Sequence, residues 1–231
     1  MRIALPDGSL RKKTTERFAK AGIKIPDQAR KHEVTIESVP ELTDGITSDH
    51  LTVFWLNPWD IPGAIFYQFA DCGIVGQDIE EEWRLGNKER FKACTLFASP
   101  PLKYSKSGDN KEALLALLGP AYGVNTSKDP TTVFGKVFTR FPLLAKSYLP
   151  EAEIVYKRGA IEAWVGSCKC NWCVGLGVEI VDSGKSLRAN RLRVLSELRR
   201  TSPILFQYLH ATFRNPLVER KVDLLTRILI G

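Results

Sequence analysis

Short apolar runs of strand length alternate along the chain with segments in which apolar residues recur every three or four positions. In the first such segment Leu10, Thr14, Phe18 and Ala21 share one face, as helical spacing requires. Regular alternation of strands and helices is typical of α/β layers built on mostly parallel sheets. We therefore predict an α/β fold with strands at residues 3–5, 34–39, 51–56, 72–75, 94–98, 133–138, 154–156 and 174–181.

Capping residues place the starts of several predicted helices. Ser9 can cap the first helix. The sequence Asp-Asn-Lys-Glu at 109–112 has the spacing of a capping box, so we expect a helix over the apolar run 113–118 that follows it. The last helix is predicted to begin with Asn215 as its cap and Pro216 at its first position.

Composition narrows the class of protein. Of the 231 residues, 44% are hydrophobic and 26% are charged, which is typical of a globular chain rather than a disordered or fibrous one. The length allows one large domain or two lobes. No apolar run approaches the roughly 18 residues that a membrane span needs, and the N-terminus lacks the apolar stretch of a signal peptide. We therefore expect neither feature.

The charge is unevenly distributed. The formal net charge is +7, and residues 185–231, with ten lysines and arginines against three acids, carry the whole surplus. This indicates an anionic partner near the C-terminal segment, such as nucleic acid, a phosphorylated metabolite or an acidic protein face. The surplus begins at Lys185 and continues, on the helix expected behind it, through Arg188, Arg191 and Arg193.

Residues 178–190 have the pattern of a strand, a tight turn and a helix start, and such a turn presents backbone N–H groups that bind phosphate. Gly184 lets the backbone approach an anion closely, and Lys185 adds a positive charge. A P-loop would need a glycine where Glu179 stands, so that motif does not fit. A carboxylate ahead of the loop instead suits a phosphorylated sugar, whose hydroxyls it can bind. The alternative is an ordinary turn that caps a helix.

From Glu179 to Leu192 the sequence resembles the loop that binds phosphoribosyl pyrophosphate (PRPP) in the ATP phosphoribosyltransferase family, Asp-Leu-Val-x-Thr-Gly-x-Thr-Leu-x-x-Asn-x-Leu. Four further blocks resemble family blocks in the same order along the chain, at residues 2–10, 60–78, 136–142 and 159–162. Five collinear blocks are far more specific than any one of them. The chain is therefore identified as a divergent member of that family.

The resemblance implies two α/β lobes of the type II periplasmic-binding-protein kind, with the active site in the cleft between them. Residues 1–93 and 184–231 would form lobe I, and residues 94–183 would form lobe II. The implied enzyme is a phosphoribosyltransferase of the first step of histidine biosynthesis. In that step N1 of ATP displaces pyrophosphate from C1 of PRPP, with Mg²⁺ on the pyrophosphate.

The resemblance also implies roles for individual residues. Glu179 and Asp182 would act in catalysis by holding the ribose and favouring the cationic sugar of the transition state. The residues that would anchor the 5′-phosphate of PRPP are Ser183, Gly184, Lys185, Ser186 and Leu187. The residues that would bind the nucleotide and pyrophosphate are Gly8, Arg11, Asp60, Gly76, Asp78 and Glu162.

The family pattern has a lysine or arginine at three positions where this chain has none, and these are Asp7, Ser9 and Asn57. Lost cations weaken polyphosphate binding unless others compensate. The candidates for compensation are Lys185, Arg11 and Lys12. The alternative function is therefore a non-catalytic or altered-specificity two-lobe protein that binds a phosphorylated ligand.

Cys168, Cys170 and Cys173 lie within six residues, where the family has a shorter connection. Three thiols could bind Zn²⁺ or an iron–sulfur centre, although no fourth ligand lies nearby in the sequence. The simpler interpretation is a loop of reduced thiols, which fits a cytoplasmic protein.

The expected small-molecule partners are ATP and PRPP. The basic tail has no recognisable nucleic-acid reader motif, so neither nucleic acid nor membrane is expected. At 231 residues the chain corresponds to the short form of the family. The resemblance then implies a separate regulatory subunit related to histidyl-tRNA synthetase, in a homodimer or hetero-oligomer.

Overall fold

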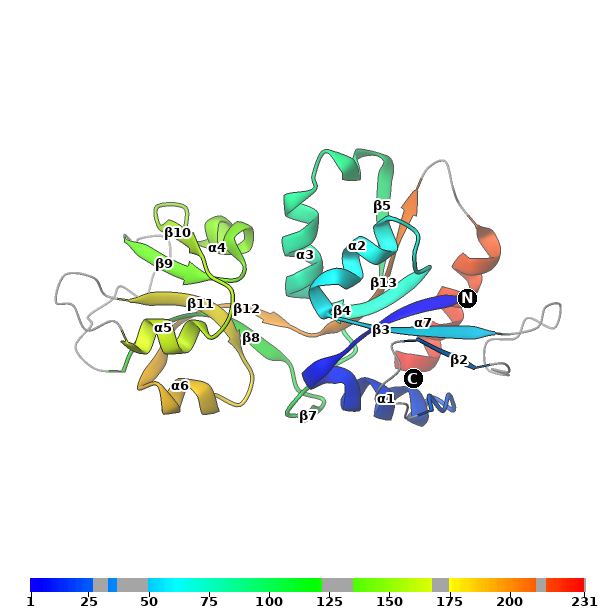
Figure 1. The fold of residues 1–231 in the computed structure, drawn as a ribbon, viewed down its shortest axis with the longest axis horizontal. Coiled ribbons are helices and arrows are strands. Elements are labelled where there is room, and N and C mark those ends of the chain that lie inside the picture. The colour runs from blue at the N-terminus through cyan, green and yellow to red at the C-terminus, as the bar shows by residue number, and fades with distance from the viewer. Residues whose placement is uncertain (27–32, 37–49, 122–134, 168–174, 211–214, 231) are drawn as a thin grey trace. The chain divides into compact units, whose positions relative to one another are not determined.

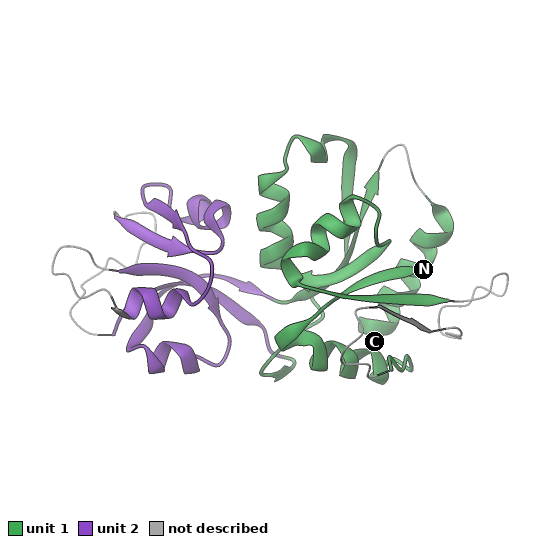
Figure 2. Ribbon diagram, viewed as in Figure 1, with its two compact units in different colours: residues 1–110, 202–231 green, residues 111–201 purple. Residues whose placement is uncertain are grey.

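The chain folds into two compact units in the computed structural model, which describes all residues except 27–32, 37–49, 122–134, 168–174, 211–214 and 231. Unit 1 comprises residues 1–110 and 202–231, and unit 2 comprises residues 111–201 (Figure 2). The sequence predicts boundaries at 93/94 and 183/184. The observed boundaries lie farther along the chain because the strands that enter and leave unit 2 stay paired up to Ala113 and Thr201.

Unit 1 is built on a six-stranded sheet with the order β2-β3-β1-β4-β13-β5 (Figure 1). Its centre is parallel, since β1 pairs with both β3 and β4 in parallel register. The other pairings are antiparallel. Every strand of this sheet except β13 overlaps a predicted one. The strands are β1 Arg2–Pro6, β2 Glu33–Ile36, β3 Leu51–Leu56, β4 Cys72–Gly76, β5 Cys94–Ala98 and β13 Pro203–His210, and a small hairpin adds β6 Tyr104–Ser105 and β7 Gly108–Asp109.

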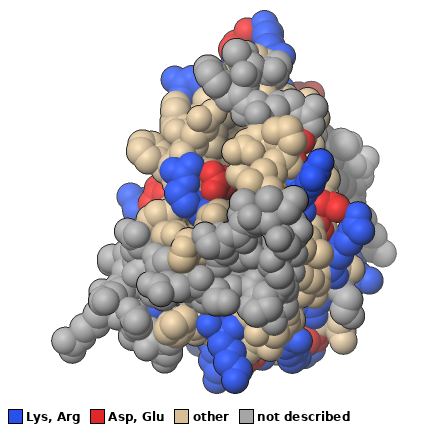
Figure 3. Space-filling model, turned by 90° about the vertical axis from the view of Figure 1, so that its right-hand side faces the viewer, with Lys and Arg blue, Asp and Glu red and all other residues tan. Residues whose placement is uncertain are grey.

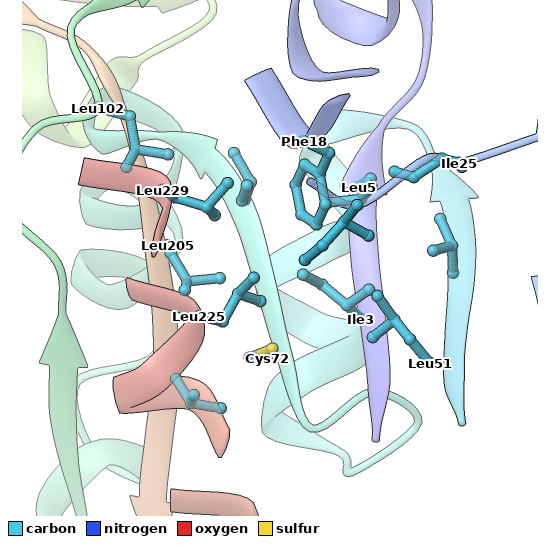
Figure 4. Close-up of a cluster of buried hydrophobic side chains, with 14 of the residues drawn as sticks. Ile3, Leu5, Phe18, Ile25, Leu51, Cys72, Leu102, Leu205, Leu225 and Leu229 are labelled. Carbon is cyan, nitrogen blue, oxygen red and sulfur yellow. The ribbon is translucent and has the colours of Figure 1, made fainter. Parts of the chain in front are cut away.

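The core of unit 1 lies on both faces of this sheet because β1 alternates its side chains between them. Ile3 and Leu5 lie in one apolar cluster with Phe18 of α1 and residues of α7 (Figure 4). Ala4 lies in a second cluster with Ile65 of α2. The helices are α1 Arg11–Lys20, α2 Ile61–Phe66, α3 Gln77–Gly86 and α7 Pro216–Ile230, with 3-10 turns η1 Gly8–Leu10, η3 Pro58–Asp60 and η4 Arg90–Ala93.

The predicted helix starts have different outcomes. Asn215 caps α7 as expected, since its Oδ1 accepts hydrogen bonds from the amides of Leu217 at 3.1 Å and Val218 at 3.4 Å. The prediction that Ser9 caps the first helix is wrong, because Ser9 lies inside the 3-10 turn and α1 begins only at Arg11.

Unit 2 is built on a five-stranded sheet with the order β10-β9-β11-β8-β12. Strand β9 is parallel to β10 and to β11, whereas β8 is antiparallel to β11 and to β12. The strands are β8 Ala113–Pro120, β9 Lys136–Thr139, β10 Glu153–Tyr156, β11 Leu176–Val181 and β12 Leu192–Thr201, and the helices are α4 Pro142–Tyr148, α5 Ile161–Ser167 and α6 Lys185–Ala189.

The predicted helix over 113–118 is wrong, because this segment is strand β8. Between β11 and β12 the strand is covered on both faces, and residues 115–119 are all buried. A strand buried on both faces has a continuous apolar run rather than an alternating one. Such a run cannot be distinguished from a buried helix by its periodicity, and the capping-box spacing ahead of it is coincidental.

The sequence analysis also missed the strands after the loop. Helix α6 ends at Ala189, and Arg191 then adopts φ 54°, so Arg193 lies on β12 rather than on a helix. The C-terminal cations are consequently divided between the two units, with residues 185–200 in unit 2 and residues 220–227 in unit 1. The face drawn in Figure 3 carries basic and acidic groups interspersed rather than one continuous basic patch.

Candidate functional site

Three parallel strands of unit 1 end side by side, and the predicted binding residues of this unit follow them closely. The amide of Asp7, just after β1, donates to the carbonyl oxygen of Leu56 at the end of β3, at 2.8 Å. This bond ties the two strand ends together. Ligands of open α/β sheets bind at this carboxyl edge. The predicted residues that the edge brings together are Gly8, Arg11, Asp60, Gly76 and Asp78.

Two contacts hold Arg11 at this edge. Its Nη1 lies 3.2 Å from Oδ1 of Asp7, and its guanidinium carbon lies 4.4 Å from the centre of the Trp55 ring. Asp7 is one of the three positions that lose a family cation. The acid at this position therefore offsets the charge of Arg11, which is the nearby candidate for compensation.

Gly76 and Asp78 are matched to each other at the start of α3. A Cβ atom on Gly76 would lie 2.3 Å from Oδ1 of Asp78, so the glycine leaves room for the carboxylate. Asp78 is only 8% exposed and lies in the first turn of the helix, where the helix dipole favours a negative charge.

Asn57 has a local structural role at the end of β3. Its Oδ1 accepts a hydrogen bond from the amide of Trp59 at 3.1 Å and so caps the 3-10 turn that ends at Asp60. Asp60 itself is exposed. The lost cation near position 57 is thus replaced by a turn-forming amide.

The predicted phosphate loop in unit 2 has the expected strand–turn–helix geometry. Strand β11 ends at Val181, and Gly184 adopts a left-handed conformation, with φ 67° and ψ 8°, directly before α6. Leu187 is 6% exposed and packs with Ile161 and Val165 of α5, which anchors the short helix. The side chains left exposed around the turn are Ser183, Lys185 and Ser186.

Backbone contacts close this loop behind the turn. The amide of Arg188 donates to the carbonyl oxygen of Gly184 at 3.1 Å, and its Nη2 donates to the carbonyl oxygen of Ser183 at 3.3 Å. Asn190, which matches the family motif, donates from Nδ2 to the carbonyl oxygen of Ser186 at 2.9 Å. The amides of the first turn of a helix have no partner within the helix, so a turn of this kind can bind an anion.

Glu179 is buried next to a cation that the sequence analysis did not single out. Arg140 donates from Nε to Oε2 of Glu179 at 3.0 Å and from Nη2 to Oε1 at 2.8 Å. Burial raises the pKa of the Glu179 carboxyl above its ordinary value, and the hydrogen bonds and charge of Arg140 oppose this shift. Arg140 lies in the block at residues 136–142, which resembles the family pattern Arg-Val-Ala-Thr-x-Tyr-Pro, and it stands at the position x that this pattern leaves open.

The remaining predicted residues of unit 2 lie close to this pair in the fold. Glu162 lies in the first turn of α5, and its charge contributes to the raised pKa of Glu179. Asp182 follows β11 directly and is half-buried. The sheet topology does indicate that Arg140 lies near Glu179. Strands β9 and β11 are parallel neighbours, so the residues at their carboxyl ends share one edge of the sheet.

The described residues contain no group of three His, Cys, Asp or Glu side chains placed to hold a metal ion. The predicted cluster of Cys168, Cys170 and Cys173 lies outside the described residues. Within the described part of the chain, no helix combines the length and apolar character needed to cross a membrane.

Comparison with known sequences gives a consistent result. A family model described as ATP phosphoribosyltransferase matches residues 57–229. An ATP phosphoribosyltransferase from Caldicellulosiruptor bescii is 29% identical over an alignment of 209 residues, and the match covers 85% of this chain and 83% of that protein. Another from Halalkalibacterium halodurans is 25% identical over an alignment of 240 residues, and the match covers 99% of this chain and 96% of that protein.

Comparison with solved structures supports the fold. The ATP phosphoribosyl transferase (HisG:HisZ) complex from Thermotoga maritima contains a chain with a TM-score of 0.65 at 20% identity, and the match covers 100% of this chain and 98% of that one. An amino acid ABC transporter substrate-binding protein from Streptococcus pneumoniae has a TM-score of 0.51 at 12% identity, with 98% and 87% covered. These likenesses confirm the predicted α/β architecture of the periplasmic-binding-protein type. Since the family model spans most of the sequence, this chain belongs to the ATP phosphoribosyltransferase family.

Proposed function

We propose that this chain catalyses the condensation of ATP with PRPP, which gives N1-(5-phosphoribosyl)-ATP and pyrophosphate in the first step of histidine biosynthesis. The observation that carries the proposal is the turn at Asp182 to Leu187. A left-handed Gly184 joins a parallel strand to a helix start there, in a chain that the family model matches over residues 57–229. Family membership supplies the reaction, and the turn supplies a place for a phosphate.

In this proposal the turn binds the 5′-phosphate of PRPP. Ser183, Gly184, Lys185, Ser186 and Leu187 surround the phosphate with backbone N–H groups, two hydroxyls and one ammonium group. Leu187 contributes through its position, since its buried side chain fixes the helix start. A phosphate at a helix N-terminus also benefits from the helix dipole.

In this proposal, residues of unit 1 contribute contacts to the nucleotide and to pyrophosphate. A Cβ atom on Gly8 would meet no described atom within 4 Å, so the backbone after β1 has open space beside it. Asp60, Gly76 and Asp78 occupy the ends of the two neighbouring strands. Arg11 is the cation of this group, and its contacts with Asp7 and Trp55 orient it before any ligand binds.

The chemistry requires alignment more than acid–base catalysis. The lone pair on N1 of ATP forms the bond to C1 of PRPP, while the electron pair of the C1–O bond leaves with pyrophosphate. The sugar becomes cationic in the transition state, so carboxylates near the ribose favour it. Asp182, Glu179 and Glu162 are the acids that unit 2 places at this edge.

Mg²⁺ fits this site as part of the substrate. Mg²⁺ is usually bound through one or two carboxylates together with substrate phosphates rather than by a complete protein cage. When bound, Mg²⁺ would neutralise charge on the departing pyrophosphate.

The proposal extends to a partner and a cellular location. The Thermotoga maritima structure is a complex of two named proteins, HisG and HisZ. By analogy, we propose a regulatory subunit related to histidyl-tRNA synthetase, in a homodimer or hetero-oligomer, and a cytoplasmic enzyme. Nucleic acid is not a proposed partner.

The test is direct. Purified protein is mixed with ATP, PRPP and MgCl₂, and phosphoribosyl-ATP is followed by its absorbance with and without the regulatory subunit. A Lys185→Ala variant should bind PRPP more weakly, while Lys136→Ala, an exposed lysine at the other end of unit 2's parallel strands, should not. No product under either condition, together with no thermal shift on adding PRPP, would overturn the proposal.

One observation favours the alternative of a non-catalytic ligand-binding protein. Asp7 and Ser9 bring no cation to the edge of unit 1, and Asp7 pairs with Arg11. A thermal shift with PRPP but no product, with the regulatory subunit present, would support that alternative.

A further inference from the structure

Unit 2 fixes a cation at the carboxyl edge of its parallel strands. Arg140 directly follows β9, between the buried residues Thr139 and Phe141. The hydroxyl of Thr139 donates to the carbonyl oxygen of Val178 at 2.8 Å and accepts from the amide of Phe141 at 2.9 Å. These bonds tie the end of β9 to β11, so the backbone of Arg140 is held where the two strands end.

The two members of the Arg140–Glu179 pair differ in exposure. The side chain of Glu179 is 3% exposed, whereas that of Arg140 is 37% exposed. Both oxygens of Glu179 accept hydrogen bonds from Arg140, and Oε1 also accepts one from the amide of Ile180 at 2.8 Å. A ribose hydroxyl would have to reach a carboxylate that is almost wholly covered. The group of this pair that a ligand can reach is the guanidinium.

The chemistry of the guanidinium points to a phosphate group. Arginine recognises phosphates through paired N–H donors in a fixed plane, and a bidentate carboxylate behind it sets the orientation of that plane. The phosphate loop begins at Asp182, three residues after Glu179 and directly after the end of β11. PRPP has two anionic ends, and the loop accounts for the 5′-phosphate. The other end is the pyrophosphate on C1.

We propose that Arg140 binds the pyrophosphate group of PRPP, and that Glu179 is a positioning residue which acts through Arg140 rather than by holding the ribose. This inference rests on the proposed function and deepens it. It revises the role that family resemblance assigns to Glu179.

The reaction gives this contact a catalytic consequence. As N1 of ATP bonds to C1, the C1–O bond breaks and its electron pair moves onto pyrophosphate. Negative charge therefore grows on the leaving group in the transition state. A guanidinium that is already oriented stabilises this charge without reorganisation. No proton transfer is required of Glu179.

Two ligands that each correspond to one end of PRPP distinguish binding by Arg140 from binding by the phosphate loop. Isothermal calorimetry with inorganic pyrophosphate reports on Arg140, and calorimetry with ribose 5-phosphate reports on the loop, both in the presence of MgCl₂. The variant is Arg140→Lys, which keeps a positive charge beside buried Glu179 and so retains the fold, but loses the planar pair of donors. Its Kd for pyrophosphate should rise about tenfold, with no change for ribose 5-phosphate.

A matched control comes from the same strand. Lys136 lies at the other end of β9 and is 61% exposed, so Lys136→Gln should leave both affinities unchanged. Equal losses for both probes in Arg140→Lys would indicate a merely structural role. Unchanged pyrophosphate affinity, or a loss confined to ribose 5-phosphate, would contradict the assignment. Any of these three results overturns the inference.

A double-mutant cycle tests the role of Glu179. Glu179→Gln removes the negative charge and one of the two oxygens that accept from Arg140, and it should weaken pyrophosphate binding alone. The double variant should then bind pyrophosphate no more weakly than Arg140→Lys, because the two residues act as one unit. If Glu179 held the ribose itself, Glu179→Gln would weaken ribose 5-phosphate binding and the two effects would add. A wild-type protein that bound neither probe nor PRPP would instead overturn the proposed function as well.

Discussion

The Nε of Arg17 donates a hydrogen bond to the backbone carbonyl oxygen of Leu229 at 2.7 Å, although the two residues are 212 positions apart. Arg17 lies near the end of α1, and Leu229 lies in the last turn of α7. The last carbonyl groups of a helix have no partner within it, and a cation there interacts favourably with the helix dipole. One side chain thus joins the first and last helices of unit 1 over their shared apolar cluster.

We expect Arg17→Met to destabilise the protein by about 1–2 kcal/mol, because it removes a charge-assisted hydrogen bond and leaves the carbonyl of Leu229 without this donor. The free energy of unfolding, measured in urea, checks the change. Lys12→Met is the control, since Lys12 is an exposed cation of the same helix. Equal stabilities of the two variants would show that the bond between α1 and α7 contributes nothing.

Gly184→Ala should weaken PRPP binding more than it weakens the fold. A non-glycine residue in the left-handed conformation costs about 1–2 kcal/mol. The added Cβ would also lie 3.2 Å from Nη1 of Arg188. We therefore expect the turn to shift and the KM for PRPP to rise several-fold, as steady-state kinetics can measure.

Gly63→Ala provides the comparison for that experiment. Gly63 lies within α2, where its Cβ would meet Trp83 at an ordinary distance of 3.8 Å. Alanine is favoured over glycine inside a helix, so kinetics and stability should stay close to wild type. A KM for PRPP that is the same in the two variants would argue against a special conformation at position 184.

Gly76→Ala should affect the nucleotide side of the site. Its Cβ would lie 2.3 Å from Oδ1 of Asp78, which forces the buried carboxylate to move. Because φ at Gly76 is −62°, alanine adds no backbone strain there, and any effect comes through Asp78. We expect the KM for ATP to rise while the affinity for ribose 5-phosphate is unchanged. A normal KM for ATP would remove Asp78 from the proposed nucleotide contacts.

The sequence predicts strands well where apolar runs are short and bounded by turns. Strands β1, β3, β4 and β5 lie where the pattern places them. The pattern fails at β8, because a strand buried on both faces has no alternation to distinguish it from a helix. It also fails at β12, where charged residues such as Arg193 and Arg199 obscure the alternation, and at β13, whose first five residues form a continuous buried run.

Prediction of the site has a different limit. The phosphate loop is local in sequence, so one segment predicts the strand, the turn at Gly184 and the helix start that the structure contains. The partner of Glu179 lies 39 residues away and becomes its neighbour only through the pairing of β9 with β11. The ion pair between Asp7 and Arg11 was also not predicted. It depends on where the helix begins, and α1 begins at Arg11, later than its predicted cap Ser9 implied.

Glu80 makes the stability of unit 1 depend on pH in a predictable direction. Glu80 is 3% exposed, and burial raises the pKa of its carboxyl above the ordinary value of 4.5, against the opposing effects of Arg84 and the Tyr208 hydroxyl. The folded state therefore binds a proton more readily than the unfolded state. The contribution of Glu80 to stability is fully present below pH 4.5 and is lost as pH rises through the higher folded pKa.

Glu80→Gln should remove this dependence, because the amide is neutral at every pH yet can still accept from Arg84 at the position where Oε1 lies 3.2 Å from Nε. We expect the difference in unfolding free energy between wild type and Glu80→Gln to move in favour of wild type as pH falls from 8 toward about 4.5. Urea denaturation at several pH values measures it. Glu89→Gln, at a side chain that is 82% exposed, should give a smaller change. Parallel curves for wild type and Glu80→Gln would mean that Arg84 and Tyr208 fully offset the burial of the carboxylate.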